Sequence, residues 1–271
     1  MDNVVEVIDL KKSYGDNQVL KGISFKARKG EILGILGING AGKTTALECM
    51  EGTLKYDQGK VVINGKMGVQ LQLAALPAYL KVNEAIKLFS KWKKAKLENK
   101  FIKALKIDEL NNKQYLELSM GQKRRLHLAL ALIGNPDILF LDEPAAGLDV
   151  AGKIALHEII NGLKSQDKTI ILSSHDLNEV EHLCDRIVVL HQGKIIFDGT
   201  AKNLATLVNK RCKIKIITET KEDEYLTDDI ASSMLSILTN YQKQNQKILD
   251  IKIDHGSLEA DFIKLTKEVT I

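Results

Sequence analysis

Residues 37–45 form a glycine-rich segment whose residue types and spacing suit the binding of phosphate. They read Gly-Ile-Asn-Gly-Ala-Gly-Lys-Thr-Thr and join an apolar run, 32–36, to residues compatible with a helix, 46–50. Glycines in such a loop let the backbone turn freely, so that successive N–H groups converge on phosphate oxygens. A helix that begins after the loop directs its positive end at the same anion. The pattern therefore predicts a phosphate-binding loop between a strand and a helix.

The polar end of this loop supplies the chemistry. In this spacing Lys43 reaches the β and γ phosphates of a nucleotide, and the hydroxyl of Thr44 is a ligand of Mg²⁺. The alternative is a glycine-rich turn with a chance lysine, and the full strand–loop–helix context argues against it. We therefore expect a nucleoside triphosphate to bind at Gly37, Ile38, Asn39, Gly40, Ala41, Gly42, Lys43, Thr44 and Thr45.

Two adjacent acids form a second candidate site. Asp142 and Glu143 follow the apolar run 138–141 and precede Pro144. Beside a phosphate loop, Asp142 would hold Mg²⁺ directly or through water. Glu143 faces differently and would polarise the water that attacks the γ-phosphate. The alternative interpretation is a surface turn rich in acids.

The elements that must position these residues alternate between strands and helices. Buried-strand patterns at 32–36, 138–141 and 169–172 are separated by a helical region, 80–133, and by a helix at 151–164. Near-continuous apolar strands that alternate with helices predict an α/β fold with a parallel sheet covered on both faces. Further strands are expected in the first part of the chain, at 4–8, 19–25 and 60–63.

The composition changes after about residue 208, where we expect a small α+β appendage. Its predicted elements are strands at 213–218 and 248–254, a helix at 229–243, and a last helix at 258–268 capped by Ser257. The acidic run from Glu219 to Glu224 is interpreted as a solvated loop.

The composition is typical of a soluble globular protein, since 44% of the 271 residues are apolar and 27% are charged. No apolar stretch approaches the roughly 18–20 residues that span a bilayer, and the N-terminus does not resemble a signal peptide. Cys49, Cys184 and Cys212 lie outside any metal-binding spacing and fit free thiols in a reducing cytosol.

Part of the formal charge of +4 lies in a lysine-rich stretch, 91–106. Apolar residues recur through this stretch and just before it, which predicts helices with basic, solvent-exposed faces. The alternative is that these faces contact a membrane surface or a partner protein. We expect no nucleic-acid partner.

Further segments, in order along the chain, resemble motifs of the nucleotide-binding subunit of an ABC transporter, and the resemblance covers residues 1 to about 205. Leu118-Ser119-Met120-Gly121-Gln122 resembles the family's signature LSGGQ, with Met120 where the family usually has glycine. Residues 146–149 resemble the segment that crosses the dimer interface, and 174–176 resemble the segment with the switch histidine. Gln72 occupies the position of the hinge glutamine, although Gln70 lies on the same face of the strand.

The resemblance implies a role for each matching residue. Glu143 and His175 would be catalytic, Tyr14 would stack on adenine, and Asp149 would lie at the interface between two subunits. A partner subunit's Ser119, Gly121 and Gln122 would close over the γ-phosphate. Thr44, Gln72 and Asp142 would hold Mg²⁺, with Gln72 linking the site to the membrane subunit.

The resemblance also implies the fold, the ligands and the partners. We expect a P-loop NTPase of ABC type at 1–207, with a mixed β core that contains a parallel sheet, an antiparallel β subdomain and a helical subdomain at about 80–133. The accessory α+β domain would be 208–271. The ligands would be ATP and Mg²⁺, and the partners a separately encoded transmembrane permease and a second copy of the ATPase. The subunit would be cytoplasmic and peripheral on the inner face of the membrane.

Residues 256–266 resemble the ending of ATPases that power bacterial exporters of drugs, antibiotics and bacteriocins, which favours export. The alternatives are the ATPase of an importer and a soluble ABC-type protein that acts on ribosomes or DNA. A single cassette without sustained heptads argues against the soluble class.

Overall fold

The computed structural model describes residues 2–70, 76–207, 212–218, 221–227, 229–244 and 246–254. Gln72, the predicted helix 258–268 and its cap Ser257 lie outside the described residues. The chain divides into two compact units, Met1–Gly199 and Thr200–Ile271. The assignment of domains to 1–207 and 208–271 stays a prediction. Across the described residues, no helix is both long and apolar enough to cross a bilayer.

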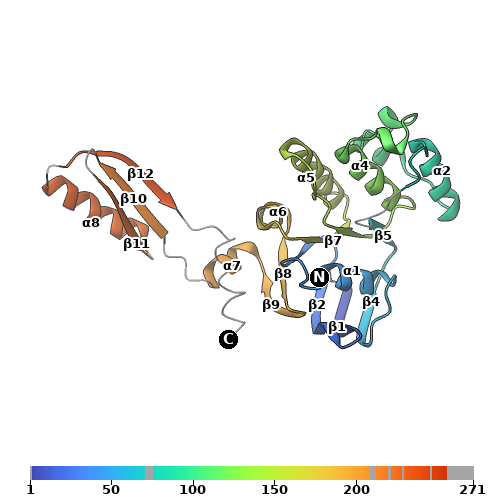
Figure 1. The fold of residues 1–271 in the computed structure, drawn as a ribbon, viewed down its shortest axis with the longest axis horizontal. Helices are drawn as coiled ribbons and strands as arrows, with labels where there is room; N and C mark the ends of the chain where they lie inside the picture. Colours follow the sequence, from blue (N-terminus) through green and yellow to red (C-terminus); the bar gives the residue numbers. More distant parts are fainter. Residues whose placement is uncertain are drawn as a thin grey trace. The chain divides into compact units, whose positions relative to one another are not determined.

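Six strands form the central sheet of the first unit (Figure 1). In spatial order they are β5 (Met67–Gln70), β6 (Ile138–Asp142), β7 (Thr169–Ser174), β3 (Ile32–Leu36), β8 (Arg186–His191) and β9 (Lys194–Gly199). The first five run parallel, and β9 pairs antiparallel with β8. The predicted parallel sheet is thus confirmed, and the carboxyl ends of β6, β7 and β3 meet at one edge.

Both faces of this sheet are covered. In β6, Leu139 and Leu141 enter one hydrophobic core, whereas Ile138 and Phe140 enter the other. Successive side chains of a strand point to opposite faces, which explains why such a strand reads as a continuous apolar run. The first core is shared with α2 (Val82–Trp92), α3 (Asn99–Ala104), two 3₁₀ turns (Asp108–Leu110 and Tyr115–Glu117), α4 (Met120–Ala131) and α5 (Val150–Lys164).

The second core lies between the central sheet, α1 (Lys43–Glu51) and an antiparallel sheet (Figure 1). The strands of that sheet are β2 (Asn17–Arg28), β1 (Asn3–Tyr14) and β4 (Gln58–Ile63). The strand predicted at 4–8 continues to Tyr14. Its apolar–polar alternation breaks at Asp9, which has φ 46°, where the pairing with β2 shifts register between Val7 and Leu10.

The C-terminal unit contains α7 (Ala201–Leu207) and a β–β–α–β arrangement. A three-stranded antiparallel sheet has the order β11 (Glu222–Thr227), β10 (Cys212–Thr218) and β12 (Ile248–Asp254). Helix α8 (Ile230–Lys243), capped by Asp229, packs Ile237 and Tyr241 against Ile214 and Ile216 of β10.

One prediction in this unit is wrong. Glu222, Asp223 and Glu224 of the acidic run form the start of β11 rather than a solvated loop. They pair with β10, whose Lys215 makes an ion pair of 2.5 Å with Glu222. Lys221 likewise lies 2.8 Å from Asp223. Lys215 on β10 and Lys221 directly before β11 thus offset the negative charge of these residues, which would otherwise disfavour their place in a sheet.

Candidate functional site

The glycine-rich segment connects β3 to α1, as its pattern predicts. Gly40 has φ 81° and Gly42 φ 105°, a region that favours glycine. At Gly37 a Cβ atom would come within 2.5 Å of the carbonyl oxygen of Leu190. Helix α1 begins at Lys43, and among the described residues no side chain caps its first turn. The loop thus presents backbone and a helix N-terminus, the combination that binds an anion.

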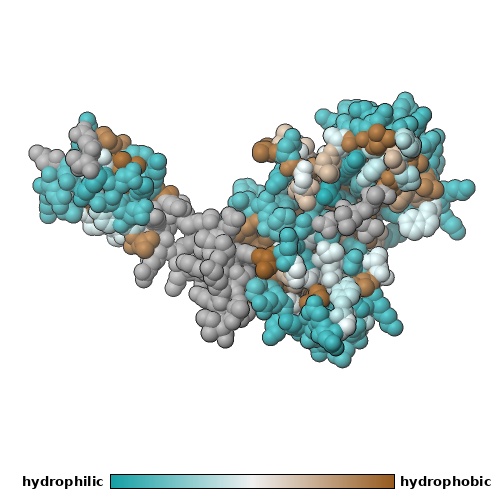
Figure 2. Space-filling model, viewed as in Figure 1, coloured by the Kyte–Doolittle hydropathy of each residue, from teal (hydrophilic) through white to brown (hydrophobic). Residues whose placement is uncertain are grey.

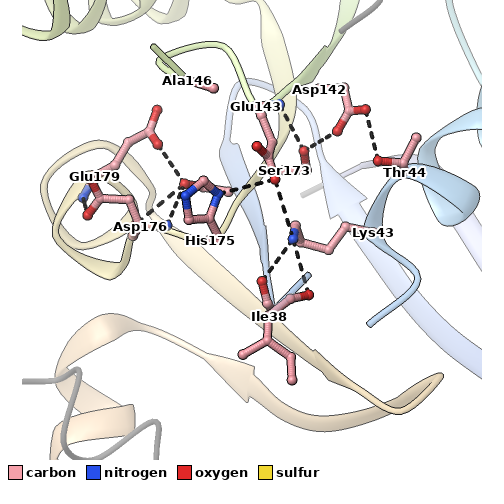
Figure 3. Close-up of polar contacts among 12 residues, drawn as sticks. Ile38, Lys43, Thr44, Asp142, Glu143, Ala146, Ser173, His175, Asp176 and Glu179 are labelled. Carbon is pink, nitrogen blue, oxygen red and sulfur yellow. Dashed lines mark hydrogen bonds and ion pairs between the residues drawn. The ribbon is translucent and has the colours of Figure 1, made fainter. Parts of the chain in front are cut away.

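Lys43 is held inside this loop and is 5% exposed. Its ammonium donates hydrogen bonds to the carbonyl oxygens of Gly37, at 2.8 Å, and Ile38, at 3.3 Å (Figure 3). It also lies 3.5 Å from Oε1 of Glu143. The loop therefore positions a positive charge between its own backbone and the acid that follows β6.

Thr44 and Asp142 form an oxygen-rich pair that suits Mg²⁺. The hydroxyl of Thr44 donates to Oδ2 of Asp142 at 3.0 Å, and the hydroxyl of Ser173 donates to Oδ1 (Figure 3). Asp142 is 5% exposed. Mg²⁺ prefers hard oxygen ligands and is usually held by one or two carboxylates together with substrate phosphates. Within the described residues no cluster of three or more acids, histidines and cysteines could hold a metal ion.

Glu143 is aimed at Lys43 and His175 by an unusual backbone conformation. Its φ is 44°, in the left-handed region that residues other than glycine rarely adopt. Its N–H donates to Oγ of Ser173 at 2.9 Å, and its Oε1 lies 3.2 Å from Nδ1 of His175 (Figure 3). The carboxylate is 13% exposed and the imidazole 52%. The acid and the histidine thus meet at the open side of the site.

A buried network supports the segment that carries His175. The hydroxyl of Ser174 donates to Glu179 at 2.6 Å and accepts the N–H of Asp176 at 3.0 Å. Asp176 caps α6 (Leu177–Leu183) and accepts a hydrogen bond of 2.7 Å from Lys153 on α5. Burial raises the pKa of Glu179, with opposing contributions from Ser174 and nearby cations. His175 therefore lies between the end of β7 and the capped N-terminus of α6.

The signature segment forms a second site with the start of α5. Ser119 caps α4 and accepts the N–H of Gln122 at 3.3 Å, while Gln122 accepts the N–H of Ser119 at 3.1 Å. Asp149 caps α5 by accepting the N–H of Gly152 at 2.8 Å. A pocket of about 490 Å³ lies among residues 119–122, 147–149 and 152–159. None of the described residues that line it belongs to the loop 37–45.

The remaining predicted residues are Tyr14 and Gln72. Tyr14 ends β1, with its ring half exposed and the ammonium of Lys12 5.5 Å from the ring centroid. Gln72 lies outside the described residues, whereas Gln70, on β5, is buried. The structure therefore brings together Lys43, Thr44, Asp142, Glu143 and His175, and it places Ser119, Gly121, Gln122 and Asp149 at a separate pocket.

Three residues of the site were missed by the sequence analysis. Ser173 lies opposite Asp142 in the register of β6 and β7, and it bonds both acids. Glu179 supports Ser174, and Arg124 links α4 to the loop after Glu143 through the carbonyl oxygen of Ala146 at 3.3 Å. The sequence contained one signal for Ser173, because a polar residue at the end of an otherwise apolar buried strand indicates a functional position.

The comparison with known proteins agrees with this geometry. The family model described as "ABC transporter" matches residues 20–146. An uncharacterized ABC transporter ATP-binding protein, MJ1023 of Methanocaldococcus jannaschii, is 39% identical over 74% of this chain and 79% of its own length. The linearmycin resistance ATP-binding protein LnrL of Bacillus subtilis is 28% identical over 97% of this chain and 98% of its own.

Two more similarities each cover about three quarters of the chain. The Nod factor export ATP-binding protein I of Burkholderia orbicola is 35% identical over 72% of this chain and 70% of its own length. A solved ATP-binding subunit of an ABC transporter is 25% identical, with a TM-score of 0.66 over 75% of this chain and 92% of that chain. The phosphate loop, the two acids at the end of β6 and these relatives lead to one conclusion: the chain belongs to the ATP-binding subunits of ABC transporters, a family that binds and hydrolyses ATP.

Proposed function

We propose that this chain powers export by hydrolysing ATP as a two-fold homodimer on a separately encoded permease. The observation that carries the proposal is the cluster at the carboxyl ends of β3, β6 and β7. There Oε1 of Glu143 lies 3.5 Å from the ammonium of Lys43 and 3.2 Å from Nδ1 of His175. A cation for phosphate, an acid for water and a histidine beside that acid are the groups that phosphoryl transfer to water requires.

Each residue has one task in the proposed reaction. Lys43 exchanges its carbonyl partners for the β and γ phosphate oxygens and offsets their charge. Glu143 accepts the proton of the attacking water, whose oxygen bonds to the γ-phosphorus as the bond to the β-phosphate oxygen breaks and ADP leaves. His175, 3.2 Å from Glu143, holds that carboxylate in place and donates to the γ-phosphate. Glu143 can act as the base without a change in its backbone, because this conformation already directs its carboxylate to Lys43 and His175.

Mg²⁺ would be held by the hydroxyl of Thr44 and the carboxylate of Asp142. When bound, the ion neutralises charge on the β and γ phosphates. Ser173 fixes the orientation of Asp142 through Oδ1, so that Oδ2 remains directed at Thr44. The adenine would lie against Tyr14, whose ring is half exposed at the end of β1.

The second half of the site would come from another copy of the chain. Ser119, Gly121 and Gln122 line a pocket that shares no residue with the phosphate loop among the described residues, so one chain presents two half-sites. Pairing two copies about a two-fold axis would bring each phosphate loop to the partner's Ser119, in a closed dimer. Water exclusion on closure would favour hydrolysis only when ATP is bound.

Export is the direction favoured by the relatives' names. One relative is named for Nod factor export, and LnrL, which matches nearly the whole chain, is named for linearmycin resistance. We propose an antibiotic, drug or peptide as the exported compound, with the subunit at the cytoplasmic face of the membrane through its permease. Export of a toxic compound would account for both kinds of name, because removing the compound from the cell confers resistance to it.

The test uses a strain that is sensitive to a peptide antibiotic and expresses the chain with the membrane protein encoded beside it. Export predicts higher resistance with the wild-type pair, loss of that resistance with Lys43→Ala, and no loss with Lys103→Ala on the exposed side of α3. Import predicts unchanged or increased sensitivity, together with uptake of a solute that depends on Lys43. Resistance that persists with Lys43→Ala would contradict a role of ATP at the loop.

A further inference from the structure

The outer strand of the C-terminal unit has features of a pairing surface. β12 lies at the edge of the sheet β11–β10–β12, and among the described strands β10 is its one neighbour (Figure 1). Three aliphatic side chains of β12 are exposed, namely Leu249 at 55%, Ile251 at 37% and Ile253 at 39%. Apolar side chains also appear among hydrophilic ones on this unit in the space-filling view (Figure 2). An edge strand with exposed apolar side chains is a template for another strand.

The hydrogen bonding of β12 shows which of its backbone groups face the open edge. The N–H of Ile251 donates to Oδ1 of its neighbour Asp250 at 2.8 Å, rather than to β10. In an antiparallel ladder, residues alternate between those that bond one neighbouring strand and those that face away from it. Ile251 and Ile253, which pair with β10 in regular register, therefore present their N–H and C=O groups outward, and a second strand would bond to these residues. Leu249 lies at a register shift between β12 and β10.

We propose that β12 pairs antiparallel with β12 of a second copy, about a two-fold axis that passes midway between the two copies of Ile251. In this register Ile251 lies opposite the partner's Ile251, and Leu249 lies opposite the partner's Ile253. Asp250 then faces the partner's Lys252, and Lys252 faces the partner's Asp250. Ile251 finds its backbone partner in the second copy of itself. Asp250 and Lys252, which lie 3.8 Å apart within one chain, each also face an opposite charge across the contact.

The charges also select this register over its neighbours. Sliding one strand by two residues preserves the backbone bonding and the faces, because side chains alternate with period two. One such shift places Asp250 opposite the partner's Asp250, and the other places Lys252 opposite the partner's Lys252. Like charges directly opposite each other are destabilising. The strand Ile248–Asp254 is thus complementary to itself in one register, which identifies a second copy as its partner.

This contact would act independently of nucleotide. A single pair of short strands buries less surface than stable dimers usually do, so the association should be weak and dependent on concentration. Joined at β12, two chains would nevertheless meet at a raised effective concentration for closure over ATP. This contact would form whichever compound is transported and whatever the roles of Glu143 and His175.

The first experiment measures self-association of the full-length chain by sedimentation velocity without nucleotide. It uses a Ser119→Arg background, which removes association through the signature segment. We expect a reversible dimer, weakened about tenfold or more by Asp250→Lys, because like charges then face each other twice. The double change Asp250→Lys with Lys252→Asp exchanges the charges and should restore the dimer. A monomer in the background protein, or a double variant no better than the single one, would overturn the proposal.

The second experiment reads the register by cross-linking with a short reagent that joins two thiols. Ile251→Cys places equivalent thiols opposite each other and should give covalent dimers well above the wild-type level. Leu249→Cys is the matched control, because it lies on the same strand and is more exposed but is not opposite its own counterpart in the proposed register. Equal cross-linking of the two variants would exclude this register, and if neither variant exceeded wild type β12 would not be the contact.

Discussion

Glu143 depends on its neighbour across the sheet. A side chain at φ 44° costs roughly 1–2 kcal/mol relative to ordinary backbone. Ser173 offsets this cost because one hydroxyl accepts the N–H of Glu143 and donates to Asp142. The proposed base and the proposed metal ligand are thereby tied to the same strand end. This arrangement permits separate tests of chemistry and of positioning.

Replacing Glu143 with Gln should lower ATP turnover by about 10²–10⁴-fold, the range typical of a lost general base. ATP binding should remain, since Lys43 and the loop backbone are unchanged. Turnover is measured by phosphate release and binding by titration with a fluorescent ATP analogue. Glu181→Gln, on the exposed side of α6, is the control and should retain wild-type turnover. Wild-type turnover in Glu143→Gln would remove Glu143 from the role of base.

Replacing Ser173 with Ala should raise the Mg²⁺ concentration needed for half-maximal turnover, because Asp142 loses the donor that orients it. The free energy of unfolding should fall by about 1–3 kcal/mol, as expected for buried hydrogen bonds to a charged group. Thr169→Val is the matched control, since this hydroxyl accepts the N–H of Gly30 at the other end of β7. The control should lose stability without a change in Mg²⁺ dependence, and an equal shift in both variants would reduce Ser173 to a structural role.

At the scale of elements, α4 joins the signature segment to the hydrophobic core. Its N-terminus is capped by Ser119, and Arg124 on the same helix bonds Ala146. Further along, His127 lies 2.9 Å from the hydroxyl of Tyr115. Burial, with Arg124 and Lys123 adding repulsion, lowers the pKa of His127 to about 4. The helix that begins at the signature segment therefore also carries a half-buried histidine whose pKa lies well below its ordinary value.

This histidine predicts an acid-sensitive contribution to stability. A folded pKa of about 4 lies below the value of about 6.5 expected in the unfolded chain, so unfolding takes up a proton between these values. The contribution is fully present above pH 6.5 and is lost as the pH falls toward 4. After a discount for solvent screening we expect about 2 kcal/mol.

The measurement is denaturant unfolding between about pH 4 and 7, the span set by these two pKa values. His127→Gln should show a flatter dependence of unfolding free energy on pH than wild type. His182→Gln, at an exposed position on α6, is the control and should keep the wild-type slope. Parallel curves for wild type and His127→Gln would show that this histidine does not carry the linkage.

At the scale of the whole molecule, the two half-sites predict assembly driven by nucleotide. Glu143→Gln with ATP and Mg²⁺ should form a stable two-fold dimer, because the ligand is bound but not consumed. Adding Ser119→Arg should block that dimer without weakening ATP binding, since bulk then lies at the partner's phosphate. Light scattering with and without ATP measures the state, and the β12 contact is suppressed by adding Asp250→Lys throughout.

The control for this experiment is Ser165→Arg at the exposed end of α5, which should leave the dimer intact. If Glu143→Gln stays monomeric at saturating ATP, two identical chains do not complete the site. Met120, which is half exposed and lines the pocket with Ser119 and Gly121, would then be the first residue to replace with glycine.

The residues of the chain by themselves determined those features that act over short separations. Within 37–45 the glycines and Lys43 lie close along the backbone, so the loop, its conformations at Gly40 and Gly42, and the start of α1 followed from local sequence. The continuous apolar runs likewise predicted a sheet covered on both faces. Asp142 and Glu143 were recognised because they follow such a run directly.

Only the tertiary structure decided what those residues meet. Thr44 and Asp142 are separated by 98 positions and become neighbours because the strand order β6–β7–β3 brings three strand ends to one edge. The same strand order places Ser173 next to Asp142, where its hydroxyl bonds both Asp142 and the N–H of Glu143. Glu222–Glu224 pair in a strand with β10, whose Lys215 offsets part of their charge together with Lys221 directly before β11. Strand order and cross-strand partners depend on burial and charge summed over distant segments, and local patterns do not contain that sum.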